Sequence, residues 1–325
     1  MRSLNRIPLG IVGAPLALRI IDSNLTGRFA GVAAVFEPDE YLSKKYEPLL
    51  LNRRVHFFHN YKKFLICGIR AVIISGGADR VDHSVKALRA KLDVLCEPPV
   101  ALNRDDFDRI ERAVNESKRS FVMAEYSCHR REILLARKLY RRGDIGRLLI
   151  ADSEESVDGE SPVCLQSSGS IGKIVMTTRL GVESATCLES SAHGISIGTE
   201  LLTLSNGANA RALNGNFGLT DSLRLIGESG IIEASRGRVR LTDCSAISEK
   251  SVSIRPEGFL LPGMTGDDFA RSSAIDSFIL KILGDSDGAE RCIDFAWTKS
   301  IVGKLLPEKF NGTQSRPYGY NIERK

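Results

Sequence analysis

The stretch from Ala71 to Pro99, AVIISGGADRVDHSVKALRAKLDVLCEPP, has the pattern of a strand, a helix and a second strand. Ala71–Ser75 is a short apolar run rich in β-branched residues and closed by glycines, as expected for a buried parallel strand that meets a turn. Val94–Cys96 predicts the next strand. Ligands bind at the carboxyl ends of such strands, so a site is expected there. Between the two strands, apolar residues recur at helical spacing and predict a helix: Val81, Val85, Leu88 and Leu92.

The same alternation of strand and helix extends over the first part of the chain, up to the strand that begins near Arg147. It predicts a doubly wound parallel sheet, that is, an N-terminal Rossmann domain, which we place at residues 1–124. Beyond it, residues 125–325 are predicted to form an α/β domain with a large, mostly antiparallel open sheet. Expected strands there include Lys173–Arg179, and one helix, Thr186–Leu204, is expected to interrupt them. Two helices, Asp267–Ile282 and Ala289–Leu305, are expected to close the chain.

The composition is that of an ordinary globular protein, with 325 residues, 42% hydrophobic and 26% charged. No apolar run approaches the roughly 20 residues of a membrane helix, so no membrane partner is expected. The seven cysteines are far apart and form no CxxC pair, which predicts no metal site and a reducing, cytoplasmic location. The net charge is only +5, and the basic helix Arg130–Arg142 has no interleaved aromatic residues. We interpret it as a solvated face rather than a nucleic-acid surface.

The first predicted strand, Ile7–Val12, ends in Gly13-Ala14-Pro15-Leu16-Ala17-Leu18. A dinucleotide-binding turn reads GxGxxG, and only its first glycine is present here. Proline suits a first helical turn but removes an amide that could bind a phosphate. Glu37 ends the next strand 24 residues later, close to the spacing of an acid that binds an adenosine ribose. Such an acid favours NAD over NADP, although Glu37 is equally compatible with a simple loop start.

Taken together, the chain resembles the glucose–fructose oxidoreductase / inositol dehydrogenase / MocA (Gfo/Idh/MocA) family. The resemblance covers nearly the whole length. It is clearest in VLCEPPVALN, ARKLYRRGDIGRLL, LESSAHGISIG and DDFARSSAIDSFILKILGDSD. It implies an N-terminal Rossmann domain, a C-terminal sheet that mediates homo-oligomer contacts, and hydride transfer between a nicotinamide cofactor and a sugar, cyclitol or related small molecule.

The chain also departs from the family pattern at its functional positions. The resemblance implies CEKP with a proton-handling lysine, whereas this chain has Pro98, which has no ionisable group. Loss of a general acid or base costs about 10²–10⁴ in rate. The family's DxGxH motif is aligned with Glu189–His193, which implies His193 as acid/base and Glu189 as its helical neighbour. The implied cofactor-binding residues are Gly13, Ala14, Pro15, Leu16, Glu37, Ser75, Gly76, Gly77, Arg80, Glu97, Pro98 and Tyr126.

Two hypotheses about function therefore stand. The first is an NAD-dependent oxidoreductase that uses His193, with Tyr126 or Glu189, in place of the lysine. The second is a catalytically inactive relative that keeps the fold as a ligand-binding or regulatory protein. Some branches of the family, such as the biliverdin reductases, also lack this lysine. The substrate has no readable motif.

Overall fold

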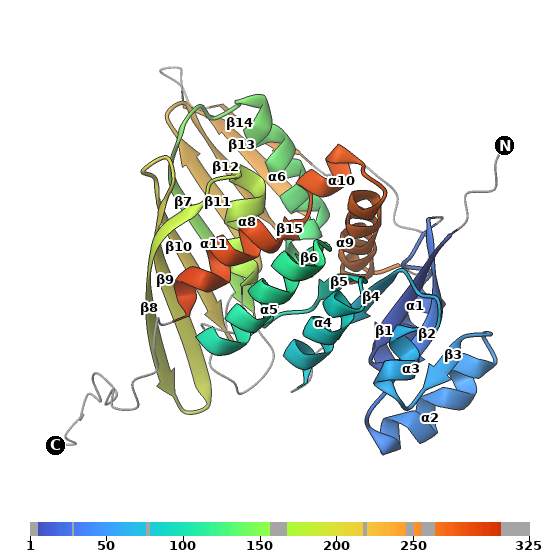
Figure 1. Cartoon of the computed structure of the whole chain (residues 1–325). Coiled ribbons are helices and arrows are strands. Elements are labelled where there is room, and N and C mark those ends of the chain that lie inside the picture. The colour runs from blue at the N-terminus through green and yellow to red at the C-terminus, as the bar shows by residue number, and fades with distance from the viewer. Residues whose placement is uncertain are drawn as a thin grey trace.

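The computed structural model describes residues 6–27, 29–75, 79–156, 168–216, 220–244, 250–254 and 264–306. Two sheets organise these residues, with helices between and around them (Figure 1). The fold class expected from the sequence is confirmed: one sheet is almost entirely parallel and the other is mostly antiparallel. The boundary at residue 124 stays a prediction.

The first sheet has seven strands in the order β15-β6-β5-β4-β1-β2-β3. Without its edge strand β15, which is antiparallel to β6, this is the order of a doubly wound dinucleotide-binding sheet. Its strands are β1 (Ile7–Val12), β2 (Ala30–Phe36), β3 (His56–Phe58), β4 (Ala71–Ile74), β5 (Asp93–Cys96), β6 (Phe121–Met123) and β15 (Ile293–Asp294).

Alternate residues of the central strands bury their side chains in two hydrophobic clusters, one on each face of this sheet. Val72 lies in the cluster that contains residues of helices α4 and α5, whereas Ile73 lies in the cluster that contains residues of α1 and α9. This double burial explains why the central strands are continuous apolar runs. The helices of the sheet are α1 (Ala14–Asp22), α2 (Glu40–Leu51), α3 (Tyr61–Leu65), α4 (Arg80–Arg89), α5 (Arg104–Ser117) and α9 (Gly266–Ile282).

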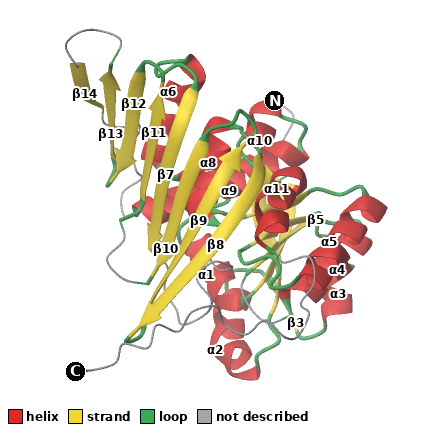
Figure 2. Ribbon diagram, turned by 90° about the vertical axis from the view of Figure 1, so that its left-hand side faces the viewer, coloured by secondary structure: helices red, strands yellow, loops and turns green. Residues whose placement is uncertain are grey.

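The second sheet has eight strands in the order β14-β13-β12-β11-β7-β10-β9-β8. Only β7 and β10 pair in parallel. Helices α6 and α8 pack on one face, and Figure 2 shows the opposite face toward the viewer. Its strands are β7 (Leu148–Ser156), β8 (Val182–Ala192), β9 (Ile195–Leu204), β10 (Asn209–Gly215), β11 (Ser222–Gly227), β12 (Gly230–Ser235), β13 (Arg238–Asp243) and β14 (Lys250–Ile254).

The remaining helices are η1 (Tyr126–His129), α6 (Arg131–Arg142), α8 (Gly169–Thr178), α10 (Ser286–Glu290) and α11 (Phe295–Leu305). Most expected elements are confirmed, including the helix of the basic stretch. The closing helix expected over Ala289–Leu305 is instead two helices, separated by the short strand β15.

Two predictions for the second half are wrong. The expected strand Lys173–Arg179 lies mostly within helix α8, and the expected helix Thr186–Leu204 is the hairpin of β8 and β9. All ten residues of α8 are buried, so the helix shows no amphipathic pattern and looks like a strand. The hairpin turns at His193 and Gly194, both of which have positive φ, as a tight two-residue turn requires.

Candidate functional site

The carboxyl ends of β1, β4, β5 and β6 lie side by side along one edge of the first sheet, which we call the carboxyl edge. Successive strands β1 and β2 run outward to one side, and the chain then returns to place β4 on the other side of β1. Such a reversal of strand order leaves a crevice outside the strand ends, where open α/β sheets bind their ligands. The candidate site is built on this edge.

Gly13 makes the turn from β1 into α1 at the carboxyl edge. Its φ is 111°, and a Cβ atom there would lie 3.1 Å from Cβ of Ser75 at the end of β4. Only glycine accommodates both that φ and this close approach. Pro15 is exposed in the first turn of α1, whereas Leu18 packs against the hydrophobic core. Ala14 and Leu16 are buried.

Glu37 lies beside this turn, as its position at the end of β2 predicts. The side chain is 4% exposed, and its Oε2 accepts a hydrogen bond of 2.8 Å from the backbone N–H of Ala14. Its Oε1 accepts from the N–H of Asp39 at 3.1 Å. The carboxylate thus lies against the N-terminus of α1, where a negative charge is favourable. Each oxygen keeps a second lone pair that can accept from a hydroxyl group.

Four side chains meet farther along the carboxyl edge, and we call them the edge cluster: Ser75, Glu97, Tyr126 and Arg271. Oγ of Ser75 donates to Oε2 of Glu97 at 2.9 Å, and Nη1 of Arg271 donates to Oε1 at 2.8 Å. The guanidinium of Arg271 lies over the Tyr126 ring, 4.1 Å from its centroid. The cluster joins the ends of β4 and β5, the start of η1 and helix α9.

Two buried polar atoms lie at the centre of the edge cluster. Nε of Arg271 has no hydrogen-bond partner among the described residues, and the Tyr126 hydroxyl lies against Glu97 and Arg271 without a well-formed hydrogen bond to either. Burial, with the Glu97 charge beside it, raises the pKa of Tyr126 well above its ordinary value, so the hydroxyl keeps its proton. Unpaired buried donors are costly unless a ligand or water satisfies them. The edge cluster therefore offers two donors to an oxygen atom of a bound molecule.

Sequence reasoning missed Arg271. It lies 174 residues from Glu97 in the chain, on a helix expected only to close the fold. No local spacing links the two residues. Of the other expected cofactor contacts, Arg80 donates from Nη1 to the Pro99 carbonyl at 2.7 Å, and Pro98 is half-buried in a cis peptide bond to Pro99. The expected contacts at Gly76 and Gly77 lie outside the described residues.

A second group of ionisable side chains, the acid–lysine cluster, consists of Glu125, Glu155, Lys173 and Asp221. Lys173 on α8 is fully buried, and its Nζ donates to the Glu154 carbonyl at 2.6 Å. The same nitrogen lies 3.8 Å from Oδ1 of Asp221 and 4.0 Å from Oε2 of Glu155. Sequence reasoning also missed this lysine, because it placed residue 173 in a strand.

Glu125 follows β6 and is 5% exposed. Its Oε1 accepts a hydrogen bond from the Ser168 hydroxyl at the start of α8. Burial, together with the negative charge of Glu155, raises the pKa of Glu125 to about 8, against the opposing effects of Ser168 and Lys173. Burial raises the pKa of Glu155 as well, so the two acids influence each other's titration.

This pKa predicts how stability depends on pH. Between about pH 4.5 and pH 8 the folded chain holds a proton on Glu125 that the unfolded chain has lost. The free energy of unfolding should therefore fall as the pH rises through this window, by up to about 1.4 kcal/mol per pH unit. Thermal unfolding from pH 5 to pH 9 should show a shallower decline in Glu125→Gln than in the wild type. Parallel curves would contradict the assignment.

The structure removes the basis for the expected pair of His193 and Glu189. His193 is exposed at the tip of the β8–β9 hairpin, and Glu189 is exposed on β8. The pairing required a helix, in which residues four apart share a face. Here Glu189 lies on β8 and His193 in the turn that follows it, and four residues of extended chain span roughly 13 Å, too far for the carboxylate to orient the imidazole. The correction follows directly from the error over residues 186–204.

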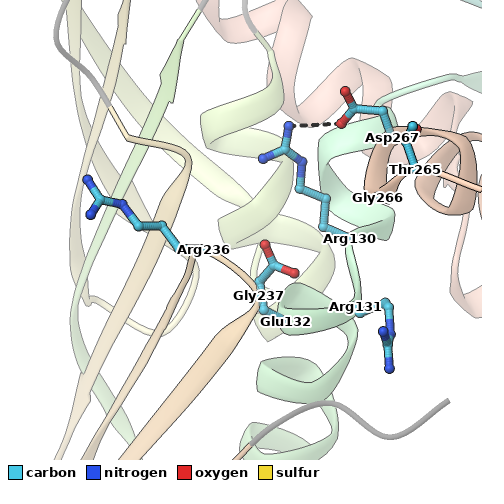
Figure 3. Close-up of a pocket in the computed structure, with 8 residues that line it drawn as sticks. All are labelled: Arg130, Arg131, Glu132, Arg236, Gly237, Thr265, Gly266 and Asp267. Carbon is cyan, nitrogen blue, oxygen red and sulfur yellow. Dashed lines mark hydrogen bonds and ion pairs between the residues drawn. The ribbon is translucent and has the colours of Figure 1, made fainter. Parts of the chain in front are cut away.

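The basic helix does not form a free cationic surface. A pocket of about 350 Å³ at its start is lined by Arg130, Arg131 and Arg236, whose side chains point in different directions (Figure 3). Arg130 pairs with Asp221 and Asp267 at 2.6 and 3.2 Å. Further along α6, the three arginines at positions 137, 141 and 142 also form ion pairs within the chain. This pairing agrees with a solvated face.

Neither a family model nor a curated protein matches the chain in sequence. Solved structures do match it in fold. A dehydrogenase from Chromobacterium violaceum is 14% identical with a TM-score of 0.76, covering 93% of this chain and 94% of that one. This chain therefore shares the fold of that protein over nearly the whole length of both. An oxidoreductase from Agrobacterium radiobacter, in complex with NAD+, L-tartaric acid and magnesium, is 14% identical with a TM-score of 0.72, covering 93% of this chain and 96% of that one. An inositol dehydrogenase homologue from Azotobacter vinelandii, complexed with NADH and myo-inositol, is 14% identical with a TM-score of 0.69, covering 94% and 96%.

No group of three or more His, Cys, Asp or Glu side chains is placed to hold a metal ion within the described residues. None of their helices combines the length and apolar character of a membrane span.

Proposed function

We propose that this chain is a nicotinamide-dependent oxidoreductase of the Gfo/Idh/MocA type, which moves a hydride between NAD and a hydroxyl-bearing carbon of a small molecule. The observation that carries the proposal is the convergence of the Gly13 turn, Glu37 and the edge cluster on the carboxyl edge of a sheet with the dinucleotide-binding strand order. Neighbours of the same fold that hold NAD+ or NADH support it.

The residues present fit a dinucleotide. The absence of a side chain at Gly13 leaves space beside the N-terminus of α1, which a Cβ atom would narrow. The Leu18 side chain does not fill this space, because it packs against the hydrophobic core. The N-terminus of α1 would hold the diphosphate through the N–H of Leu16, because the N–H groups of Gly13 and Ala14 already donate to Phe36 and Glu37 and Pro15 has none. Glu37 would hold the adenosine ribose. The edge cluster would contact the nicotinamide end. When bound, the cofactor supplies the hydride acceptor or donor, and the protein positions and polarises the substrate.

The substrate proposed is a sugar, cyclitol or related small molecule. Arg271 would donate a hydrogen bond to one of its oxygen atoms, because its buried Nε has no partner among the described residues, and the Tyr126 hydroxyl beside it would be the second donor. Homo-oligomer contacts through the open face of the second sheet, and a cytoplasmic location, are part of the same proposal. Leu188 and Leu201 are exposed large apolar residues on its strands β8 and β9.

Titration with NADH and NADPH tests the proposal, followed by fluorescence transfer from the protein's aromatic residues. NADH should bind more tightly than NADPH, because the Glu37 carboxylate accepts from ribose hydroxyls and repels a 2′-phosphate. Glu37→Gln should weaken NADH binding about tenfold, the value of a lost hydrogen bond to a charged group, and erase the preference. Glu40→Gln, an exposed acid at the start of α2, is the matched control and should change neither affinity.

The alternative is a catalytically inactive ligand-binding protein. It is favoured by one observation, that Pro98 lacks an ionisable group where the family resemblance implies a lysine. Absence of NADH and NADPH binding at millimolar concentration would leave this alternative and contradict the redox proposal.

A further inference from the structure

Lys173 is the one lysine among the described residues whose side chain is fully buried. An ammonium group withdrawn from water is costly unless it is paired and hydrogen-bonded. Here the Glu154 carbonyl, Glu155 and Asp221 supply the partners, at 2.6, 4.0 and 3.8 Å. The three come from β7 and from the start of β11, on the second sheet. Helix α8 therefore places a buried positive charge beside the carboxylates of Glu155 and Asp221.

Acids outnumber cations around this lysine. Glu125, Glu155 and Asp221 face Lys173. The described residues add one further cation to the group, Arg130, which pairs with Asp221 at 2.6 Å. Oε2 of Glu155 is buried and makes no hydrogen bond within the described residues. The surplus negative charge is relieved when one carboxyl keeps its proton. Burial raises the pKa of both Glu125 and Glu155, and Glu125, the most buried of the three acids, is the better placed to hold that proton.

The acid–lysine cluster lies next to the edge cluster. Glu125 directly precedes Tyr126 at the carboxyl end of β6. Helix α8 approaches this point closely through Gly172, where a Cβ atom would lie 2.9 Å from Sγ of Cys128 and 3.5 Å from Cγ of Glu125. Glu155 and Asp221 keep 17% and 23% of their side chains exposed. The side of the acid–lysine cluster formed by Glu155 and Asp221 thus reaches the protein surface.

We propose that Glu125 accepts and returns the hydroxyl proton of the substrate, and that Lys173 is the positioning cation that allows it to ionise. This inference rests on the proposed function and assigns the proton transfer that Pro98 cannot perform. In the oxidising direction the substrate O–H bond breaks and its proton goes to Glu125. The C–H hydrogen leaves with its electron pair as hydride to NAD+, and the carbon–oxygen double bond forms. A carboxyl that titrates near pH 8 suits proton transfer at neutral pH.

The test needs no knowledge of the substrate. Affinities for NAD+ and NADH are measured by calorimetry from pH 6.5 to pH 9, in two buffers that differ in ionisation enthalpy. The nicotinamide ring of NAD+ is positively charged, so it favours ionised Glu125. We expect NAD+ affinity to rise about fivefold or more over this range, with proton release on binding, and NADH affinity to change much less.

Glu125→Gln should bind both nucleotides with no difference between their pH profiles. Lys173→Arg keeps the positive charge and should preserve the rise for NAD+. Two matched controls are Glu132→Gln and Lys281→Arg. Glu132 is a buried acid on α6, and Lys281, near the end of α9, pairs with Asp294. If NADH binds but the wild type and Glu125→Gln show the same pH profile for NAD+, the role of Glu125 is refuted and the redox proposal survives. If neither nucleotide binds, both fail.

Discussion

Replacement of Lys173 by methionine should lower the free energy of unfolding by about 3 kcal/mol, because it leaves Glu155 without its buried cation, whereas Asp221 keeps its pair with Arg130. Methionine keeps most of the volume of the side chain, so the loss reports charge rather than a cavity. Thermal or urea unfolding of the purified protein measures it. Recovery of only insoluble protein would be an extreme form of the same result.

The matched control for this prediction is Lys299→Met. Lys299 also forms an ion pair, with Glu111, but its side chain is 55% exposed. An exposed pair contributes about 1 kcal/mol or less. Equal effects of the two substitutions would mean that the acid–lysine cluster is not a buried charge site.

Replacement of Gly13 by valine should weaken NADH binding about 100-fold or more. A side chain at φ 111° strains the turn, and its Cβ would lie 3.1 Å from Ser75, so the start of α1 must move away from the carboxyl edge. A shift of that kind displaces the N-terminus of α1, with the N–H of Leu16 that would hold the diphosphate. The titration used for the wild type measures the loss.

Gly68→Val separates this effect from strain alone. Gly68 has a comparable φ of 93°, but a Cβ there meets nothing within 4 Å. Its substitution should cost stability and leave NADH affinity within about twofold, because strain without a shift at the site leaves binding intact. Similar losses of affinity in both variants would argue against a nucleotide site at Gly13.

Local patterns sufficed for the first sheet and failed for part of the second. The strand ends at Gly13, Glu37, Ser75 and Glu97 could be placed because buried parallel strands are short apolar runs closed by turn residues. Helix α8 is buried on all sides, so its sequence does not alternate between apolar and polar residues with the 3.6-residue period that would identify a helix. The β8–β9 hairpin is hidden in the sequence because its turn residues, His193 and Gly194, coincide with the stretch aligned with the DxGxH motif.

The candidate site was predictable only where it follows the strand ends. Tyr126 and Glu97 were expected at the carboxyl edge, and they lie together there. Arg271 and Lys173 reach their partners through tertiary packing, from helices far along the chain. Nothing in their local sequence distinguishes them from surface cations. Their burial, which only the fold reveals, is what marks them.

The most direct test of the account is a crystal structure of the chain grown with NADH. The account predicts the diphosphate at the N-terminus of α1 beside Gly13, the adenosine ribose within hydrogen-bond distance of Glu37, and the nicotinamide beside the edge cluster of Ser75, Glu97, Tyr126 and Arg271. A structure in which millimolar NADH leaves the carboxyl edge empty, or binds elsewhere, would contradict it.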